Sequence, residues 1–297
     1  MKHVQPIDRH ILFRAVRKSP GPRRRWHWET LAIHVILVGV CLLVLFPVFY
    51  TILTSLRPPR LGLSRTFIPD TWYFDHYIRL LSTPRFPRYI LNSAINSLGG
   101  ALITTVVSAL AGYACVRYTF HGRSLFLIFI MGMLLLPGLT NLIPLYKLAS
   151  DLGLLDSYLI MIAIYSAYGV PFGIWVMKSF IERIPRELED AAAVDGASPL
   201  QIIGHIVLPL ARPGLVAVFL LNFVYNWNDF LTALIMLSST AMKTATVGLF
   251  DFQNQLTGNE NELLAAACVI IMLPGLVVFL IARKTFLWAM LDGAVKG

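Results

Sequence analysis

Long apolar runs, separated by polar or charged segments, dominate this chain. A helix that crosses a bilayer needs about 20 predominantly apolar residues. Runs of this kind cover residues 31–53, 89–116, 125–148, 159–180, 215–237 and 263–286. Prolines interrupt several of these runs, and membrane helices tolerate them where neighbouring groups satisfy the freed carbonyls. The pattern predicts an all-α integral membrane protein with six transmembrane helices.

The composition agrees with this class. Of the 297 residues, 57% are hydrophobic and only 14% are charged, whereas a soluble domain of this length needs far more polar surface. Much of the net charge of +9 comes from a block of Lys and Arg that precedes the first apolar run. Such a block could bind nucleic acid, but the positive-inside rule explains it more simply. We therefore predict no nucleic-acid partner, a basic cytoplasmic segment over residues 1–30 and a transmembrane domain over residues 31–297, in contact with membrane lipid.

The distribution of basic residues also predicts the orientation. Six crossings place both termini on the same side of the membrane. The inner segments would be 1–30, 117–124, 181–214 and 287–297; with their flanks they hold 17 Lys and Arg, against 8 on the outer side. This bias predicts that the N-terminus and the C-terminus are cytoplasmic. The outer loop over residues 54–88 is unusually basic, and its stretch "FDHYIRLLS" predicts a short helix on the membrane surface.

One polar cluster interrupts the fifth apolar run, in "NFVYNWNDFLTAL". It consists of Asn222, Asn226, Trp227, Asn228 and Asp229. Positions 222, 226 and 229 share one face of a continuous helix, and an ionisable residue inside a bilayer usually faces a cavity or a partner. The cluster indicates a pathway for a small polar solute. A strip of hydrogen bonds between helices, or an acid solvated near the interface, would give the same pattern.

The segment between the fourth and fifth runs is polar and strongly patterned. Three acids lie near the start of the helix that "IPRELEDAAAV" predicts, where the helix dipole favours negative charge; they are Glu187, Glu189 and Asp190. Asp195-Gly196 is a turn signal. Ser198 and Gln201 form a capping-box pattern with Pro199 between them, so a second short helix should follow and end before Pro209. A helix, a sharp turn and a helix with small residues favour a docking surface over a self-packed connector.

Here the chain resembles a known family. "ELEDAAAVDGASPLQIIGHIVLPLARPGL" is similar to the EAA motif of permease subunits in bacterial ATP-binding-cassette (ABC) importers. Asp190, Ala191, Ala192 and Gly196 fall on the Glu, Ala, Ala and Gly of the motif, with an acid that is one methylene shorter. The stretches "ILNSAINS", "AGYACVRYTFHGR", "IPLYKLASDLGLLDSY", "GIWVMKSFIERIP", "WNDFL" and "GAVKG" resemble the carbohydrate branch, which includes the second permease of the maltose system. They run from about residue 90 to the end of the chain.

The resemblance implies a type I ABC importer permease fold in the bacterial cytoplasmic membrane. It makes residues 181–212 a cytoplasmic loop that couples the permease to an ATPase. The coupling residues that it implies are Glu189, Asp190, Ala191, Ala192, Asp195, Gly196 and Ala197. It implies four kinds of partner: a second, different permease subunit, two ATPase subunits, an extracytoplasmic solute-binding protein and a sugar, oligosaccharide or polyol.

The sequence contains no nucleotide-binding P-loop, and no pattern of catalytic or metal-ligating residues. We therefore expect no enzymatic activity, no metal and no cofactor in this chain, with ATP and Mg bound by the partner ATPases. Two other classes remain open. Asp229 would suit an ion-coupled secondary transporter, and a membrane assembly protein without transport activity would also match the apolar runs.

Overall fold

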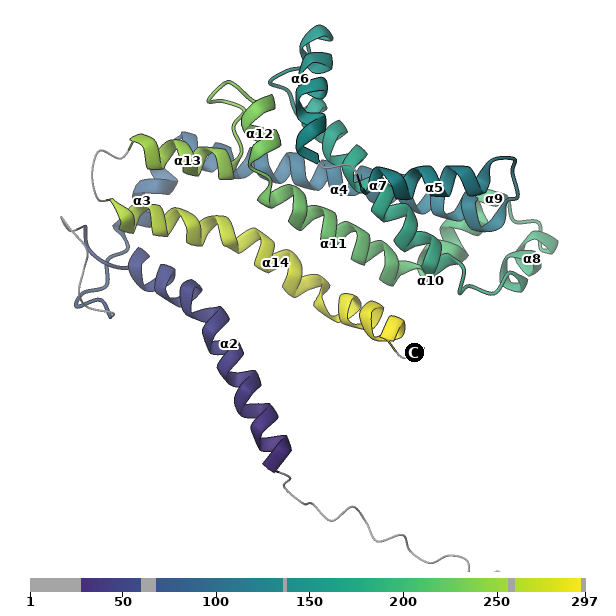
Figure 1. Cartoon of the computed structure of the whole chain (residues 1–297), viewed down its shortest axis with the longest axis horizontal. Helices are drawn as coiled ribbons and strands as arrows, with labels where there is room; N and C mark the ends of the chain where they lie inside the picture. Colours follow the sequence, from purple (N-terminus) through teal and green to yellow (C-terminus); the bar gives the residue numbers. More distant parts are fainter. Residues whose placement is uncertain (1–27, 60–67, 136–137, 256–259, 295–297) are drawn as a thin grey trace, which may run out of the picture. The chain divides into compact units, whose positions relative to one another are not determined.

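The computed structural model describes residues 28–59, 68–135, 138–255 and 260–294, which contain helices and loops but no strand (Figure 1). Nearly all of the predicted basic segment, residues 1–30, lies outside these ranges, as do the last three residues of "GAVKG". The described residues up to Phe49 form one unit, and those from Tyr50 onward form a second. The all-helical class predicted from the sequence is confirmed for the described residues.

Four of the six apolar runs form single long helices. They are α2 (Trp28–Ser55), α4 (Arg85–Arg117), α7 (Tyr158–Ile181) and α14 (Asn261–Ala294). Each is long and apolar enough, over all or most of its length, to cross a membrane. The predictions for the first, second, fourth and sixth runs therefore identify real helices.

The third run, residues 125–148, does not form one continuous helix in the described residues, and whether it crosses the membrane stays a prediction. It contains α5 (Arg123–Met133), the 3₁₀ turn η1 (Gly138–Asn141) and α6 (Leu142–Asp151). Pro144 lies in the first turn of α6, where the missing amide hydrogen of proline is tolerated. A run of apolar residues does not by itself distinguish one long helix from two short ones.

The fifth run, residues 215–237, is also divided, and its crossing of the membrane likewise stays a prediction. The described residues here form α11 (Arg212–Asn228) and α12 (Leu231–Met236). Asp229, whose backbone is extended, and Phe230 separate them. Before α11 come α9 (Pro199–Ile202), the π-helical turn η2 (Ile203–Val207) and α10 (Leu208–Leu210). A bend of 77° separates residues 199–210 from α11.

The remaining helices connect these long ones. They are α3 (Asp75–Ser82), α8 (Glu187–Val194) and α13 (Ala245–Gln255). The short helix predicted from "FDHYIRLLS" is confirmed as α3. The second short helix of the 181–212 loop does not end before Pro209, because that proline lies at the start of α10 and the chain stays helical to Leu210.

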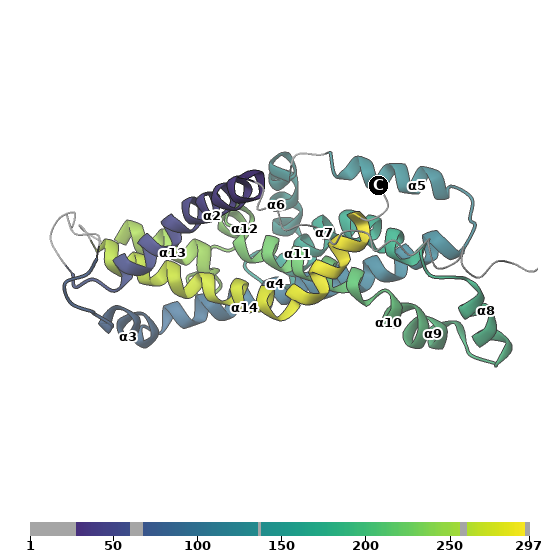
Figure 2. The ribbon, with the colours of Figure 1, turned by 90° about the horizontal axis from the view of Figure 1, so that it is seen from below.

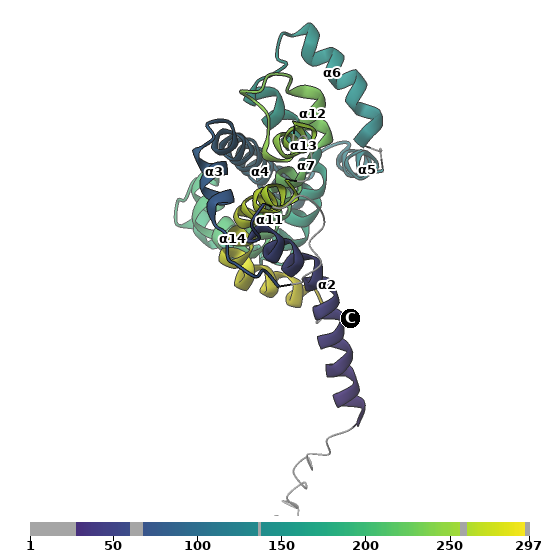
Figure 3. The same cartoon turned by 90° about the vertical axis from the view of Figure 1, so that its left-hand side faces the viewer.

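In the unit that begins at Tyr50, α4 and α7 lie side by side along most of their length (Figures 1 and 2). α11 packs on α4 and α7, and its other side contacts α14 (Figure 3). The contact between α4 and α7 uses small and hydroxylated residues. Thr104 Oγ1 donates to the Ser166 carbonyl at 3.5 Å, and Ser108 Oγ donates to the Val170 carbonyl at 3.4 Å. Small residues let helix backbones approach closely in a membrane, so this pair forms the tightly packed centre of the unit.

Asn92 and Ser93 of "ILNSAINS" hold the loop between α12 and α13. The Asn92 amide donates to the carbonyls of Ala241 and Lys243, both at 2.9 Å. Ser93 Oγ accepts the amide hydrogen of Ala245 at 2.8 Å. Both residues are almost fully buried, so these polar side chains fix the end of α4 to a loop about 150 residues further along the chain.

The α4–α7 contact leads to a first prediction. A Cβ atom added at Gly173 would collide with the Ser108 side chain and lie 3.2 Å from Val218 Cγ1. We expect Gly173→Ala to lower the stability of the purified protein by about 1–3 kcal/mol, because overpacking a close contact strains both helices. Thermal unfolding in detergent measures this. Gly132→Ala in α5 is the control, since no atom lies within 4 Å of its added Cβ; equal melting temperatures for the two variants would contradict the prediction.

Candidate coupling surface and solute pathway

The predicted helix–turn–helix in the 181–212 loop is present. α8 ends at Val194 with Asp195 as its C-cap, and Gly196 takes the left-handed conformation with φ +86°. Two hydrogen bonds close the turn: Gly196 N donates to the Ala193 carbonyl at 3.1 Å and Ala197 N donates to the Ala192 carbonyl at 2.9 Å. This is a Schellman motif, in which glycine is preferred because it lacks a Cβ. The turn therefore has one defined shape.

A capping box starts the next helix, as the sequence predicts. Ser198 Oγ accepts the amide hydrogen of Gln201 at 3.4 Å, and Gln201 Oε1 accepts that of Ser198 at 2.8 Å. Pro199 occupies the first position of α9. The two caps together make the turn between α8 and α9 rigid although much of it is exposed.

Most of the predicted coupling residues are exposed. Asp190, Ala191, Asp195 and Gly196 lie on the surface of α8 and its turn, at one end of the α4–α7 pair (Figures 1 and 2). Ala192 and Ala197 are half-buried and pack against the apolar cluster beneath. Glu189 differs from the others, since its side chain is buried and points to α4, where it contacts Arg117.

Two apolar side chains beside the turn are not obvious from the motif. Val194 is 88% exposed and Leu200 is 77% exposed. Asp195, Gly196 and His205 line an open hollow of about 360 Å³ between the turn and η2. Exposed apolar residues next to acids and a hollow are typical of a surface that another protein covers. Their position in the sequence, directly beside the glycine turn, is the signal from which their exposure could have been predicted.

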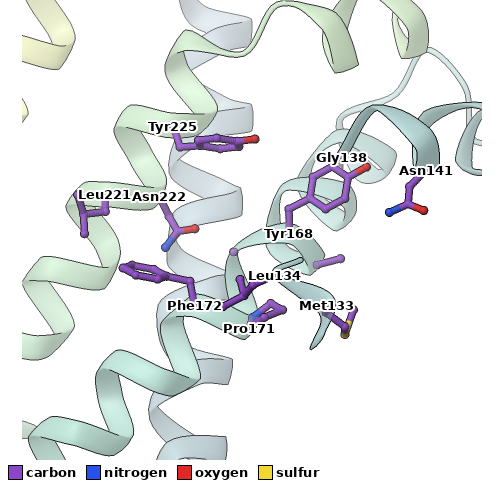
Figure 4. Close-up of a pocket in the computed structure, with 12 residues that line it drawn as sticks. Met133, Leu134, Gly138, Asn141, Tyr168, Pro171, Phe172, Leu221, Asn222 and Tyr225 are labelled. Carbon is purple, nitrogen blue, oxygen red and sulfur yellow. The ribbon is translucent and has the colours of Figure 1, made fainter. Parts of the chain in front are cut away.

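A second feature is a cavity of about 450 Å³ between α7, α11 and the broken third run (Figure 4). Tyr168 and Phe172 come from α7, and Asn222 and Tyr225 from α11. Asn141 is contributed by η1. The Tyr168 hydroxyl is buried and has no hydrogen-bond partner among the described residues. No charged side chain lies among the described residues that line this cavity.

Of the five predicted pathway residues, the structure places only Asn222 at this cavity. Asn226 and Trp227 are buried in the packing of α11, and Trp227 Nε1 donates to the Ile271 carbonyl of α14 at 3.0 Å. Asn228 is exposed, and its amide donates to the Val224 carbonyl at 2.7 Å. The face shared by positions 222, 226 and 229 is interrupted, because α11 ends before Asp229.

Sequence reasoning missed the aromatic residues of the cavity. Tyr225 follows Asn222 by three positions, and Tyr168 and Phe172 are four positions apart on α7. Residues three or four apart lie on the same side of a helix, so this spacing was the available signal. It was not distinctive, since aromatic residues are common in apolar helices.

Asp229 stabilises the break between α11 and α12. Its Oδ1 accepts from Thr232 Oγ1 at 2.9 Å. Its Oδ2 accepts from the Tyr165 hydroxyl and from the Ala233 amide, both at 3.0 Å. Thr246 Oγ1 donates to the Asp229 carbonyl at 2.7 Å. These contacts favour the interpretation of Asp229 as a hydrogen-bonding residue between helices.

The three contacts of the Asp229 carboxylate predict the effect of a nearly isosteric change. Asp229→Asn keeps an oxygen for the Ala233 amide hydrogen and gains an NH₂ group that can donate to the Thr232 hydroxyl, but it replaces a charged acceptor by a neutral one. We expect it to lower the stability by about 1–2 kcal/mol, because hydrogen bonds to a charged acceptor contribute more than hydrogen bonds to a neutral one. Thermal unfolding in detergent measures this, with Asn228→Asp as the control on the exposed neighbour. An unchanged melting temperature for Asp229→Asn would contradict the role of the carboxylate in the break.

Helices of spanning length, an exposed capped turn and a cavity between helices, uncharged in its described lining, are features expected of a membrane permease. The chain belongs to the family of binding-protein-dependent transport system inner membrane components, whose sequence pattern matches residues 104–286. The protein is therefore an inner-membrane component of an ABC importer and not an enzyme. Transport by members of this family depends on a binding protein.

Similar proteins cover almost the whole chain. The trehalose transport system permease protein SugB of Mycobacterium tuberculosis (strain CDC 1551 / Oshkosh) is 33% identical over 93% of this chain and 100% of SugB. The trehalose/maltose transport system permease protein MalG of Thermococcus litoralis (strain ATCC 51850 / DSM 5473 / JCM 8560 / NS-C) is 31% identical over 91% of this chain and 99% of MalG. The maltodextrin transport system permease protein MdxG of Bacillus subtilis (strain 168) is 30% identical over 89% of this chain and 95% of MdxG.

The fold also matches a solved transporter. A chain of a bacterial ABC transporter that imports the acidic polysaccharide alginate superposes with a TM-score of 0.78 and 24% identity. The match covers 90% of this chain and 100% of that chain. At this identity the likeness establishes the fold alone, and it confirms the predicted ABC importer permease fold.

Proposed function

We propose that this chain is one of two different permease subunits of an ATP-driven importer for a sugar, an oligosaccharide or a polyol. Two ATPase subunits and an extracytoplasmic solute-binding protein complete the transporter. The observation that carries the proposal is the exposed α8–Gly196–α9 turn in a chain that has no P-loop of its own. Such a subunit needs ATP hydrolysis by a partner, and the turn offers the partner a rigid surface.

The proposed topology has six crossings with both termini in the cytoplasm. Four crossings are the long helices, and the bent or broken segments around α11 and α5 supply the other two. Helices that cross only part of the bilayer are acceptable if protein, and not lipid, surrounds the backbone N–H and C=O groups that the break leaves unpaired. α11 meets this condition, since it packs against α4, α7 and α14. The excess of basic residues on the side of the 181–212 loop supports this orientation.

The proposed coupling surface is the exposed face of α8 and its turn. Asp190 and Asp195 provide negative charge there, and Val194 provides apolar area. The shorter acid at position 190 retains the charge that the EAA motif places there. ATP and Mg are bound by the ATPase subunits, and this chain contributes no cofactor site. A displacement of the loop would tilt the helices as rigid bodies between two states.

The proposed solute pathway is the cavity between α7, α11 and the third run. Sugars present apolar C–H faces and many hydroxyl groups, so aromatic rings and uncharged hydrogen-bonding groups suit them. Tyr168, Phe172 and Tyr225 provide the rings, and Asn141 and Asn222 provide amides. The buried Tyr168 hydroxyl has no partner in the described part of the chain, so a solute hydroxyl that reached it would supply the missing hydrogen bond. An uncharged lining favours a neutral solute over an anionic one.

The test is to purify the complete transporter, reconstitute it in vesicles and measure ATP hydrolysis with its binding protein and a panel of solutes. We expect a neutral sugar or polyol to stimulate hydrolysis and to be taken up, and glycerol phosphate to do neither. Uptake that continues on an ion gradient without ATPase subunits would instead support the secondary transporter. Normal uptake after deletion of this chain would support an assembly role.

A further inference from the structure

A buried ion pair attaches α8 to α4. Glu189 Oε1 lies 2.7 Å from Arg117 Nε, and the Tyr113 hydroxyl donates to Glu189 Oε2 at 2.9 Å. The Arg117 and Glu189 side chains are only 10% and 8% exposed. Both carboxylate oxygens of Glu189 therefore accept hydrogen bonds, at a position with little access to water. Glu189 is thus held on the inner side of α8, while Asp190 beside it is exposed.

The same guanidinium also holds the end of α7. Arg117 is the last residue of α4, and its Nη2 donates to the Ile184 carbonyl at 2.8 Å and to the Ile181 carbonyl at 3.4 Å. Ile181 is the last residue of α7. One planar side chain therefore connects three helices, since its nitrogens point in fixed directions. A lysine has a single nitrogen and does not reproduce this fork.

The other contacts beneath α8, among the described residues, are apolar and not directional. Ala192 and Ala197 pack against an apolar cluster that includes Ile181, Ile184 and Ile202. Alanine methyl groups allow a helix to slide or rotate over such a surface at small cost. The ion pair does not allow this, because displacement would leave a charge buried without a partner. Since buried ion pairs contribute little net stability compared with apolar packing, the position of α8 is the property that this pair controls.

We propose that Arg117, Glu189 and Tyr113 form a clamp that makes α8 move as one body with the adjoining ends of α4 and α7. This inference rests on the proposed function, in which α8 contacts an ATPase. The clamp passes the displacement of α8 to α7, the helix that carries Tyr168 and Phe172 into the cavity. The three residues are positioning residues and do not touch the solute.

The experiment uses the complete reconstituted transporter with Glu189→Gln, Arg117→Lys or Tyr113→Phe. Two quantities are measured: the amount of assembled complex and the number of solute molecules transported per ATP hydrolysed. Glu182→Gln is the matched control, since Glu182 forms an exposed pair with Lys178 at the same end of α7. We expect Glu189→Gln complexes to transport about fivefold fewer solute molecules per ATP, the lower end of allosteric couplings, and the control to match the wild type.

A purely structural role predicts a different result, with less assembled complex but a normal ratio of transport to hydrolysis. A normal ratio in Glu189→Gln overturns the clamp. If the Glu189→Gln transporter does not assemble, Tyr113→Phe becomes the deciding variant, because it removes one hydroxyl and keeps the ion pair. If this variant transports as many solute molecules per ATP as the wild type, the proposal is overturned. Absence of ATP-driven uptake in the wild type contradicts the proposed function itself, and is thereby distinguished from failure of the clamp.

Discussion

Replacing Gly196 by valine is expected to abolish most solute-stimulated ATP hydrolysis in the assembled transporter. The turn requires φ +86° at this position. A left-handed conformation costs a residue with a Cβ roughly 1–2 kcal/mol, and a β-branched residue more. Each 1.4 kcal/mol corresponds to a factor of ten, so we expect a reduction of about tenfold or more. The ATPase rate with saturating solute-loaded binding protein measures the effect.

Gly204→Val is the matched control for this change. Gly204 is also exposed, lies in the same loop, has no positive φ and would place its Cβ in open space. We expect this variant to retain near-normal stimulation. Equal rates for the two variants would show that the shape of the α8–α9 turn is not needed for coupling, and would contradict the proposed docking surface.

Replacing Ala167 by tryptophan is expected to block solute movement while ATP binding and assembly persist. Ala167 is an exposed residue of α7 that lines the 450 Å³ cavity. An indole there would occupy space next to Tyr168 and Asn222 that the proposed pathway requires. We expect uptake to fall by about tenfold or more. This corresponds to a loss of at least about 1.4 kcal/mol in the free energy of forming the productive complex between transporter and solute. Uptake of labelled solute by vesicles measures the effect.

Ala163→Trp serves as the control for the added bulk. Ala163 lies one helical turn earlier on α7, is also exposed and does not line this cavity. We expect it to leave uptake within about twofold of the wild type, as exposed substitutions usually have small effects. If both tryptophan variants transported normally, the cavity would not be the solute pathway.

The features that the sequence predicted well are those with local causes. Gly196, Ser198, Pro199 and Gln201 specify a turn and a cap within a few residues, and the structure contains both. The long helices α4, α7 and α14 follow from composition alone, because lipid requires backbone hydrogen bonds to be satisfied within each helix.

The features that the sequence did not predict depend on residues far apart in the chain. From the sequence, Glu189 is one more acid in the first turn of α8. Its burial is explained by Arg117 and Tyr113, which lie 72 and 76 positions earlier. The break at Asp229 is stabilised partly by Tyr165, 64 positions earlier. Apolar composition is the same on both sides of such a break, so the length of a run does not reveal it.

The close contact between α4 and α7 limits how these helices can change during evolution. The space between Gly173 and Ser108 holds no further atom, since even a methyl group added at Gly173 would collide with the Ser108 side chain. A larger residue at position 173 is therefore acceptable only together with a smaller one at position 108. Among relatives of this chain, the two positions should vary as a pair of nearly constant total volume, while exposed positions such as 163 vary independently.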